Sequence, residues 1–430
     1  MPTDSQTPNR PPSSSPFSPT SNLADALERM AHEAQSQLGT VTQTAYFLGN
    51  GIQRAVTDEV FDLFMPQTWS PANLLRQGSR WMRQGMTIAR EFTSPNTPAL
   101  IFQELRNKMG VFTLVKNLAS KLNLPSDEFV PLTTLVEKAY SVPPYEALWA
   151  VEGLGHYYTD SYRKFHGEPH GLLAEGSEGV IPGSLTMLHA GMGLAFADRL
   201  VGELTPETPA PQVRAALQQF VDLCTNNSKK GYRGCAIESL GLVTRDFYPD
   251  LLPVVSQQFR EIAPDLTGYF WHGTGRALYF SRQYFLPGLC IWCDVGELVD
   301  TEPEQLSALA GLAWAISLVN QRQPAITENQ LRLYVEESPL ARAFTQGVIS
   351  TNIMRADTTP NQDFQAAFVN YQPKDPQTAA SWNRRIAQPV KTGLESYYPI
   401  LRDHAGLEGV FCYQDLGKLA DQLSGQTSNK

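Results

Sequence analysis

Two glutamates and two histidines stand three or four residues before a glycine in similar sequence contexts: Glu152, His189, Glu238 and His272. If the segments that carry them stack, all four side chains could face one groove. A glutamate and a histidine held together in a dry groove can perform acid–base chemistry. In the alternative interpretation, each residue caps a turn or braces a neighbouring helix. We favour bracing, because catalytic sites are usually asymmetric, and we assign no catalytic residue.

The surroundings of His272 are the most typical of a site. Trp271 precedes it, and Arg276 follows one helical turn later. An aromatic ring and a cation at this spacing could share one binding surface. We therefore predict Trp271 and Arg276 as binding residues.

Cys290 and Cys293 have the C-x-x-C spacing of a redox dithiol. No βαβ pattern surrounds them, and no second C-x-x-C pair exists to complete a zinc site. We expect two buried cysteines that pack as apolar side chains, with redox activity as the alternative. Five cysteines in a long chain fit a reduced, intracellular protein better than a disulfide-stapled one.

His166 and His170 would share one face of a helix and could bind a metal together with Glu168 and His156. Pro169 argues against a continuous helix there, so we expect a solvated loop and predict no metal site. The chain also lacks the short motifs of phosphate loops, zinc proteases and serine hydrolases. We therefore predict no cofactor.

The composition narrows the class of protein. The chain has 430 residues, of which 42% are hydrophobic, and a formal net charge of −9. This acidic balance argues against broad nucleic-acid binding, which normally needs a basic face. Residues 1–21 are rich in Pro and Ser without an apolar h-region, so we interpret them as a disordered tail. No apolar run is long enough to span a membrane, and we expect a cytoplasmic protein.

Residues 22–98 are predicted to form N-terminal helices. One of them carries three arginines on a single stripe, Arg76, Arg80 and Arg83, with Trp81 beside it. Such a helix could bind a partner or lie on an anionic membrane, and we include these four residues among the predicted binding residues. The alternative is the solvated face of an ordinary surface helix.

From residue 99 onward, helix-sized apolar segments alternate with Pro, Gly and Asn. Six glycines recur in related contexts, 38, 48, 34, 36 and 36 residues apart: Gly155, Gly193, Gly241, Gly275, Gly311 and Gly347. Gly110 is a candidate for an earlier, divergent copy. A helical unit of about 36 residues is typical of helix-pair repeats, in which glycine lets two helices approach closely. The stretches 283–299 and 408–416 are the best candidates for short strands.

The predicted fold is mainly α, with tandem helix-pair repeats of about 36 residues, an α-solenoid-like or compact helical array, and few short strands. The predicted organisation is a tail (1–21), N-terminal helices (22–98), a helical-repeat core (99–357) and a C-terminal cap and tail (358–430).

The segments "YEALWAVEGLGHYYTD", "SLTMLHAGMGLAFADRL", "CAIESLGLVTRDFYPDLL" and "YFWHGTGRALYFS" follow one another in a distinctive order. In these segments, and over roughly Tyr145–Asp357, the chain resembles the family of unknown mechanism encoded in enediyne polyketide biosynthesis clusters, with relatives in cyanobacteria and other bacteria. The resemblance implies a bacterial, accessory role in biosynthesis and supplies no catalytic residue.

Three functions are compatible with these observations. The first, which we favour, is a non-catalytic helical-repeat scaffold that holds a protein partner or an apolar small molecule. The second is an enzyme that modifies a polyene or polyketide intermediate in an aromatic pocket, with these residues as its lining: Tyr157, Tyr158, Phe196, Trp271, Tyr279 and Trp314. The third is a peripheral assembly factor for a membrane complex such as a photosystem, which would contact an anionic membrane through the arginine stripe.

Overall fold

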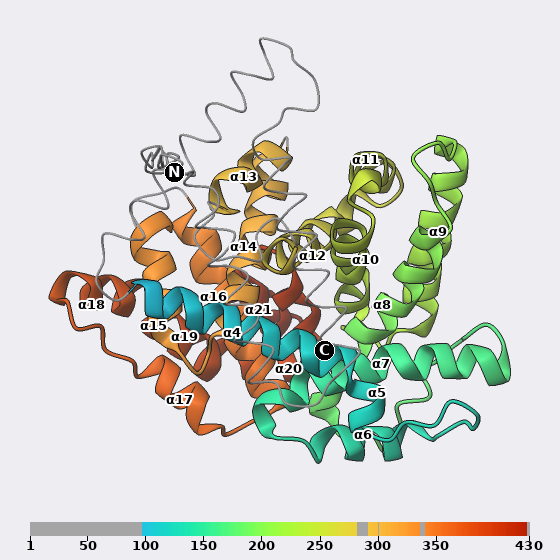
Figure 1. Ribbon diagram of the computed structural model, residues 1–430, viewed down its shortest axis with the longest axis horizontal. Coiled ribbons are helices and arrows are strands. Elements are labelled where there is room, and N and C mark those ends of the chain that lie inside the picture. Colours follow the sequence, from blue (N-terminus) through green and yellow to red (C-terminus); the bar gives the residue numbers. More distant parts are fainter. Residues whose placement is uncertain (1–96, 282–290, 300, 336–339, 428–430) are drawn as a thin grey trace, which may run out of the picture. The chain divides into compact units, whose positions relative to one another are not determined.

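The computed structural model describes residues 97–281, 291–299, 301–335 and 340–427. Its described part is built of helices and contains no strand, which confirms a mainly α fold (Figure 1). By backbone contacts the chain divides into Met1–Gln77 and Gly78–Lys430. The tail and the arginine stripe with Trp81 lie outside the described residues.

The two predicted strands are wrong where the structure describes them. Ile291–Leu298 forms the helix α13, and Leu407–Phe411 forms a 3-10 helix, η8. In both stretches the β-branched and aromatic side chains reflect burial, because Val295 and Phe411 are fully buried. An apolar run this short does not distinguish a buried helix from a strand.

Six helices form the centre of the molecule, and each carries one of the repeated glycines: α7 (Pro144–His166), α8 (Leu185–Gly202), α10 (Arg233–Phe247), α12 (Thr267–Phe280), α14 (Glu302–Val319) and α16 (Ala341–Thr358). Each packs against the next in chain order. The helix α14 is buried without interruption from Ser307 to Val319. A helix that is apolar on all sides can be stable only inside such a core.

The row of six helices curls back on itself. Near the end of α16, Asp357 accepts a hydrogen bond of 2.8 Å from Thr186 of α8. Two residues earlier, Arg355 donates a hydrogen bond of 3.1 Å to the carbonyl oxygen of Tyr145 in α7. The first and last central helices therefore meet, and the core is a compact array.

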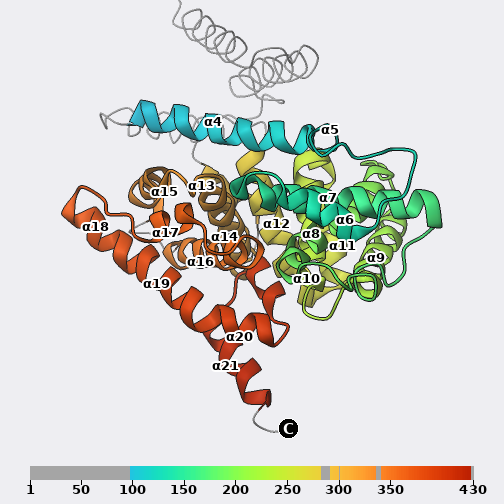
Figure 2. The ribbon, with the colours of Figure 1, turned by 90° about the horizontal axis from the view of Figure 1, so that it is seen from below.

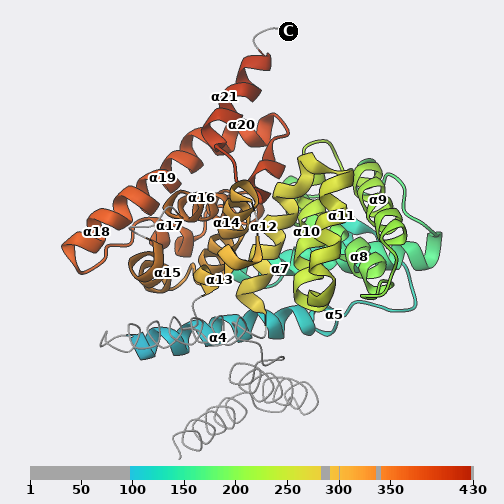
Figure 3. The same ribbon diagram turned by 90° about the horizontal axis from the view of Figure 1, so that it is seen from above.

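Further helices surround this row. Before the row come α4 (Thr97–Lys116), α5 (Leu118–Lys121) and α6 (Leu132–Tyr140), and α6 packs against α7. Between the central helices the chain forms α9 (Ala210–Asn227), α11 (Leu252–Ile262), α13 and α15 (Pro324–Gln330). The C-terminal part contains α17 (Asp363–Val369), α18 (Pro376–Trp382), α19 (Gln388–Thr392), α20 (Tyr398–Asp403) and α21 (Leu416–Thr427). Figures 2 and 3 show α4 and α18–α21 on opposite sides of the central helices.

Buried polar contacts attach α4 to the core. The Asn107 amide donates hydrogen bonds of 2.9 Å to Asn320 and to Gln323, just after α14. The hydroxyl of Tyr279, in α12, donates to Glu104 over 2.8 Å. Because these groups are buried and paired, α4 is fixed in one register across the ends of α12 and α14.

Glycines allow the central helices to touch backbone to backbone. A Cβ on Gly241 would lie 1.8 Å from the carbonyl oxygen of Phe270, and one on Gly273 would lie 2.0 Å from that of Glu238. The helices α10 and α12 thus each supply a glycine where the other presents its backbone. The pairs α7 with α8 and α12 with α14 are joined in the same reciprocal way, through these glycines: Gly155, Gly191, Gly275 and Gly311.

In the two remaining contacts a hydroxyl replaces one of the glycines. Gly193 of α8 abuts Ala236 of α10, and the Ser239 hydroxyl donates a 2.8 Å hydrogen bond back to the carbonyl oxygen of Ala190. In α16, Gly347 abuts α14 and Thr351 donates to a carbonyl oxygen of that helix over 3.0 Å. All six repeated glycines therefore lie at helix contacts.

The helix-pair repeat itself stays a hypothesis, since only a loop and the short 3-10 turn Pro182–Ser184 separate α7 from α8. Gly110 does not behave as an earlier copy. It is exposed on α4, and a Cβ there would meet nothing within 4 Å.

We predict that Gly241→Ala destabilises the protein by about 1–3 kcal/mol or more, because the new methyl group would overlap the backbone of α12. Gly110→Ala is the matched control in an open helical position, where removing glycine should stabilise by about 0.5–1 kcal/mol. Thermal and urea unfolding of both variants measure the difference. Equal stability of the two variants would contradict a packing role for Gly241.

Candidate functional site

Three of the four ionisable candidates meet in the core, around Arg276. The Arg276 guanidinium donates to Glu238 over 2.8 Å and to Glu152 over 3.1 Å. The ring atom Nδ1 of His272 lies 2.9 Å from the other carboxylate oxygen of Glu238. We call Glu152, Glu238, His272 and Arg276 the Arg276 cluster. It joins α7, α10 and α12.

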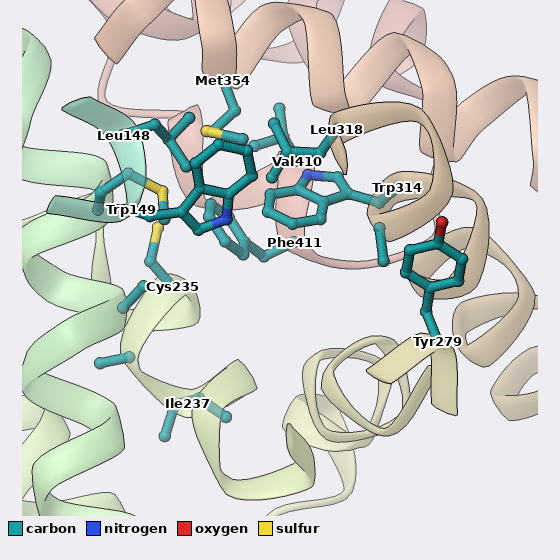
Figure 4. Close-up of a cluster of buried hydrophobic side chains, with 14 of the residues drawn as sticks. Leu148, Trp149, Cys235, Ile237, Tyr279, Trp314, Leu318, Met354, Val410 and Phe411 are labelled. Carbon is teal, nitrogen blue, oxygen red and sulfur yellow. The ribbon is translucent and has the colours of Figure 1, made fainter. Parts of the chain in front are cut away.

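The Arg276 cluster is enclosed by aromatic side chains. Glu238 and His272 are 0% exposed, Arg276 is 3% exposed and Glu152 8%. The Arg276 guanidinium lies 4.2 Å from the ring centre of Trp314. The ring of Phe411, from η8, lies 6.1 Å from that of Trp314 and 6.3 Å from that of His272. Figure 4 shows Trp314 and Phe411 side by side within this apolar core.

Burial and the neighbouring charges together set the protonation of the cluster. Removal from water lowers the pKa of His272, although its bond to Glu238 opposes this. His272 is therefore neutral at pH 7, donating from Nδ1 to Glu238. Burial also raises the pKa of Glu152, opposed by Arg276. For Arg276, burial is outweighed by Glu238 and Glu152, which together raise its pKa.

The cluster retains unsatisfied atoms. Within the described part of the chain, neither Nε2 of His272 nor Nε of Arg276 has a hydrogen-bond partner. An unmade buried hydrogen bond costs about 1–3 kcal/mol. The cluster is thus a tightly paired group of charges in which two buried nitrogen atoms remain unsatisfied.

The helix contacts explain why these polar residues recur before glycines. The backbone carbonyl oxygens of Glu152, Glu238 and His272 each lie where a Cβ on a glycine of the neighbouring helix would stand, within 2.0 Å. The side chain of a residue at such a contact begins between two helices and therefore points into the core. The recurrence therefore has a geometric cause.

His189 lies apart from the cluster. Its Nδ1 atom lies 2.7 Å from the carbonyl oxygen of Leu185, and its Nε2 accepts a 3.0 Å hydrogen bond from the backbone N–H of Lys229. Its ring stacks on Tyr232 with 5.0 Å between ring centres. His189 thus holds the loop between α9 and α10 in place. The four candidates therefore do not share one groove.

The other predicted residues occupy structural positions. Trp271 is 3% exposed, packs against Phe270 with ring centres 5.3 Å apart, and hydrogen-bonds to Glu304. It is turned away from solvent, as is Arg276. Of the C-x-x-C pair, Cys290 lies outside the described residues and Cys293 belongs to α13.

The histidine-rich segment ends a helix. The helix α7 stops at His166, and Gly167 follows with φ of 89°. Glu168 forms two hydrogen bonds of 2.7 Å with Arg199, so its carboxylate already has a partner. In the described part of the chain, no group of three or more His, Cys, Asp or Glu side chains is placed to hold a metal ion.

Sequence reasoning missed two buried charged residues in α16. Arg355 is 0% exposed, and burial lowers its pKa to about 10. Burial also raises the pKa of Asp357 to about 6, although hydrogen bonds from Thr186 and Tyr398 oppose the shift. Charged residues this close to an otherwise apolar run, as in "VISTNIMRAD", are the signal that could have identified them.

Comparison with protein-family models, curated proteins and solved structures finds no match to this chain. The resemblance to the enediyne family therefore stays a hypothesis. Among the described helices, none combines the length and the apolar character that crossing a membrane requires.

We predict that Arg276→Met destabilises the protein by about 3–5 kcal/mol, because it leaves Glu152 and Glu238 buried without their cation. Arg402→Met is the control: this exposed arginine pairs with Asp403 on the surface, and its loss should leave the melting temperature nearly unchanged. Urea unfolding at pH 7 compares the two. Matching unfolding midpoints would show that the cluster contributes nothing to stability.

The buried imidazole of His189 should also make stability depend on pH. In the unfolded chain it takes up a proton near pH 6.5, but burial lowers its pKa in the folded protein to about 4. Between these values the unfolded state binds more protons than the folded state. The free energy of unfolding therefore decreases as the pH is lowered from 6.5 to 4, by up to about 3 kcal/mol. Protonation of Nε2 would also remove its bond from Lys229.

We predict a shallower loss of stability between pH 6.5 and pH 4 for His189→Gln than for the wild type. Asp357 contributes with the opposite sign, since its pKa is raised, so the difference between the two proteins isolates His189. His170→Gln, in an exposed loop position, is the control and should keep the wild-type slope. Identical slopes for His189→Gln and the wild type would contradict the prediction.

Proposed function

We propose that this protein is a non-catalytic helical-repeat scaffold, an accessory protein of a bacterial biosynthetic or assembly pathway. One observation carries the proposal: Glu238 and His272, the pair best suited to acid–base chemistry, bond to each other and are 0% exposed. A general acid or base must come within hydrogen-bond reach of its substrate. Buried residues that are bonded to each other in this way stabilise the fold.

The placement of the cluster also supports a bracing role. Arg276 connects α12 to α7, two helices that are not neighbours in the central row. Removing one partner of a buried ion pair is strongly destabilising, whereas the intact pair contributes little net energy. Such a cluster selects one arrangement of the helices, which a scaffold needs in order to present a constant surface. The occupant we propose is a protein partner or a small apolar molecule.

The resemblance to the enediyne family supplies the proposed pathway, and with it a cytoplasmic, bacterial setting. A second candidate function is an enzyme acting on a polyene or polyketide intermediate. It is favoured by Nε2 of His272, which lacks a partner among the described residues, on a ring that lies near the aromatic side chains of Trp314 and Phe411. Because His272 is 0% exposed, a substrate could reach the imidazole only if surrounding side chains moved.

The two functions predict different results for His272→Asn in a host strain that lacks the gene. We expect the variant to be less stable than the wild type by about 1–3 kcal/mol. Where it remains folded, we expect it to restore the wild-type phenotype of the strain. Glu238→Gln is tested in the same assay. Far-UV circular dichroism with thermal melting shows whether each variant is folded. A folded His272→Asn protein that restores nothing would overturn the scaffold and favour the enzyme.

A further inference from the structure

A cavity of about 160 Å³ lies between α4, α7 and the segment that follows α14. Two arginines, Arg106 and Arg322, line it together with apolar and aromatic side chains, among them Val111, Leu114 and Trp149. No residue of the Arg276 cluster is in its lining. The cavity is therefore separate from the group considered above.

The cations at this cavity have no carboxylate partner. Within the described part of the chain, neither Arg106 nor Arg322 forms an ion pair. The Arg322 guanidinium stacks on the ring of Tyr145, 3.7 Å from its centre. The guanidinium also hydrogen-bonds to Tyr145, but Arg322 is exposed and keeps further N–H donors for a ligand.

A third guanidinium lies behind the cavity wall. Arg355 is 5.4 Å from the ring centre of Tyr145 and 5.2 Å from that of Trp149, both of which line the cavity. It is 0% exposed, and its Nη2 has no hydrogen-bond partner among the described residues. A buried cation without a carboxylate contributes a positive field that is poorly screened by water.

The remaining charged group of the lining is already neutralised. Glu146 faces the cavity, but its carboxylate forms an ion pair with Lys121. The balance of charge at the cavity is therefore positive. The bonds of Asn107 to Asn320 and Gln323 hold α4 against the core, so the helix that carries Arg106 is fixed in place.

We propose that this cavity binds a small monocarboxylate with an apolar body. Guanidinium groups match the planar geometry of a carboxylate, and Arg106 and Arg322 offer two of them. Val111, Leu114 and Trp149 provide an apolar surface for the rest of the molecule. A volume of about 150 Å³ can hold benzene, so the cavity suits a single ring, with the carboxylate at the exposed Arg106 and Arg322. Benzoate is the probe that fits this description.

The site extends the proposed function without depending on it. A scaffold or an enzyme could each carry a site for a small carboxylate between α4 and α7. Binding is measured here on the purified full chain, whereas the scaffold proposal is tested in cells with variants of the Arg276 cluster. Failure of one therefore leaves the other standing.

The test is isothermal titration of the full chain with benzoate, with benzamide and with inorganic phosphate. We expect saturable binding of benzoate, and binding at least about tenfold weaker for benzamide, which has the same shape without the charge. Phosphate, which has charge without an apolar body, should also bind at least about tenfold more weakly. Equal binding of benzoate and phosphate would overturn the amphipathic character of the site.

Two variants test the arginines. Arg106→Met and Arg322→Met should each weaken benzoate binding at least about tenfold. Arg106 is exposed on α4, so its replacement should not impair folding even if loss of the Arg322 stack does. Arg342→Met is the matched control, an exposed arginine on α16 about 20 Å from Arg355 along the helix. No saturable binding by the wild type, or unchanged binding in Arg106→Met, would contradict the proposal.

Discussion

Direct backbone contact between neighbouring helices is the constraint on which this structure depends. At five successive contacts along the central row, a glycine stands where a Cβ would overlap the main chain of the neighbouring helix: Gly155, Gly193, Gly241, Gly275 and Gly347. Glycine within a helix costs about 0.5–1 kcal/mol relative to alanine. Close packing of the helices must offset this cost at each contact, since loosely packed helices would gain nothing from it.

The close contacts also determine where polar side chains can be buried. The helices α7, α10 and α12 approach so closely that Arg276 reaches carboxylates on two other helices. Charges removed from water are tolerated only when they are paired, so each member of the Arg276 cluster depends on the others. The cluster and the glycines act together: the glycines bring the helices into contact, and the charges admit only one way of arranging them.

Arg276 and the two arginines beside Tyr145 have different surroundings. Arg276 is shared between two carboxylates and covered by Trp314, so its hydrogen-bonding capacity is largely used within the protein. Arg322 and Arg355 flank Tyr145 without a carboxylate, and Arg322 faces a cavity. Within the described residues, Arg355 is a buried cation without a carboxylate, and Arg322 is exposed at the cavity, so this second group is the better candidate for recognising a ligand. The fold thus separates Arg276, whose charge is paired within the protein, from Arg322 and Arg355, which have no carboxylate partner in the described part of the chain.

The sequence by itself determined the helical class and the places of helix contact. Glycines such as Gly241 and Gly275 recur at helical spacing within apolar segments, and that pattern has few explanations other than close packing. It also identified Glu152, His189, Glu238 and His272 as related positions, with Arg276 one helical turn after His272. Local pattern failed for residues 291–299 and 408–416, because a short buried run looks alike in a helix and in a strand.

Only the tertiary structure decided which of the polar residues meet. His189 and His272 stand at equivalent places in the sequence, yet the first bonds to backbone atoms near Lys229 and the second to Glu238. The bond from Arg276 to Glu152 spans 124 residues, and the cavity joins α4 to residues far along the chain. Such contacts depend on how the row of helices curls back, which is set by the sum of many packing contacts and leaves no periodic signal in the sequence.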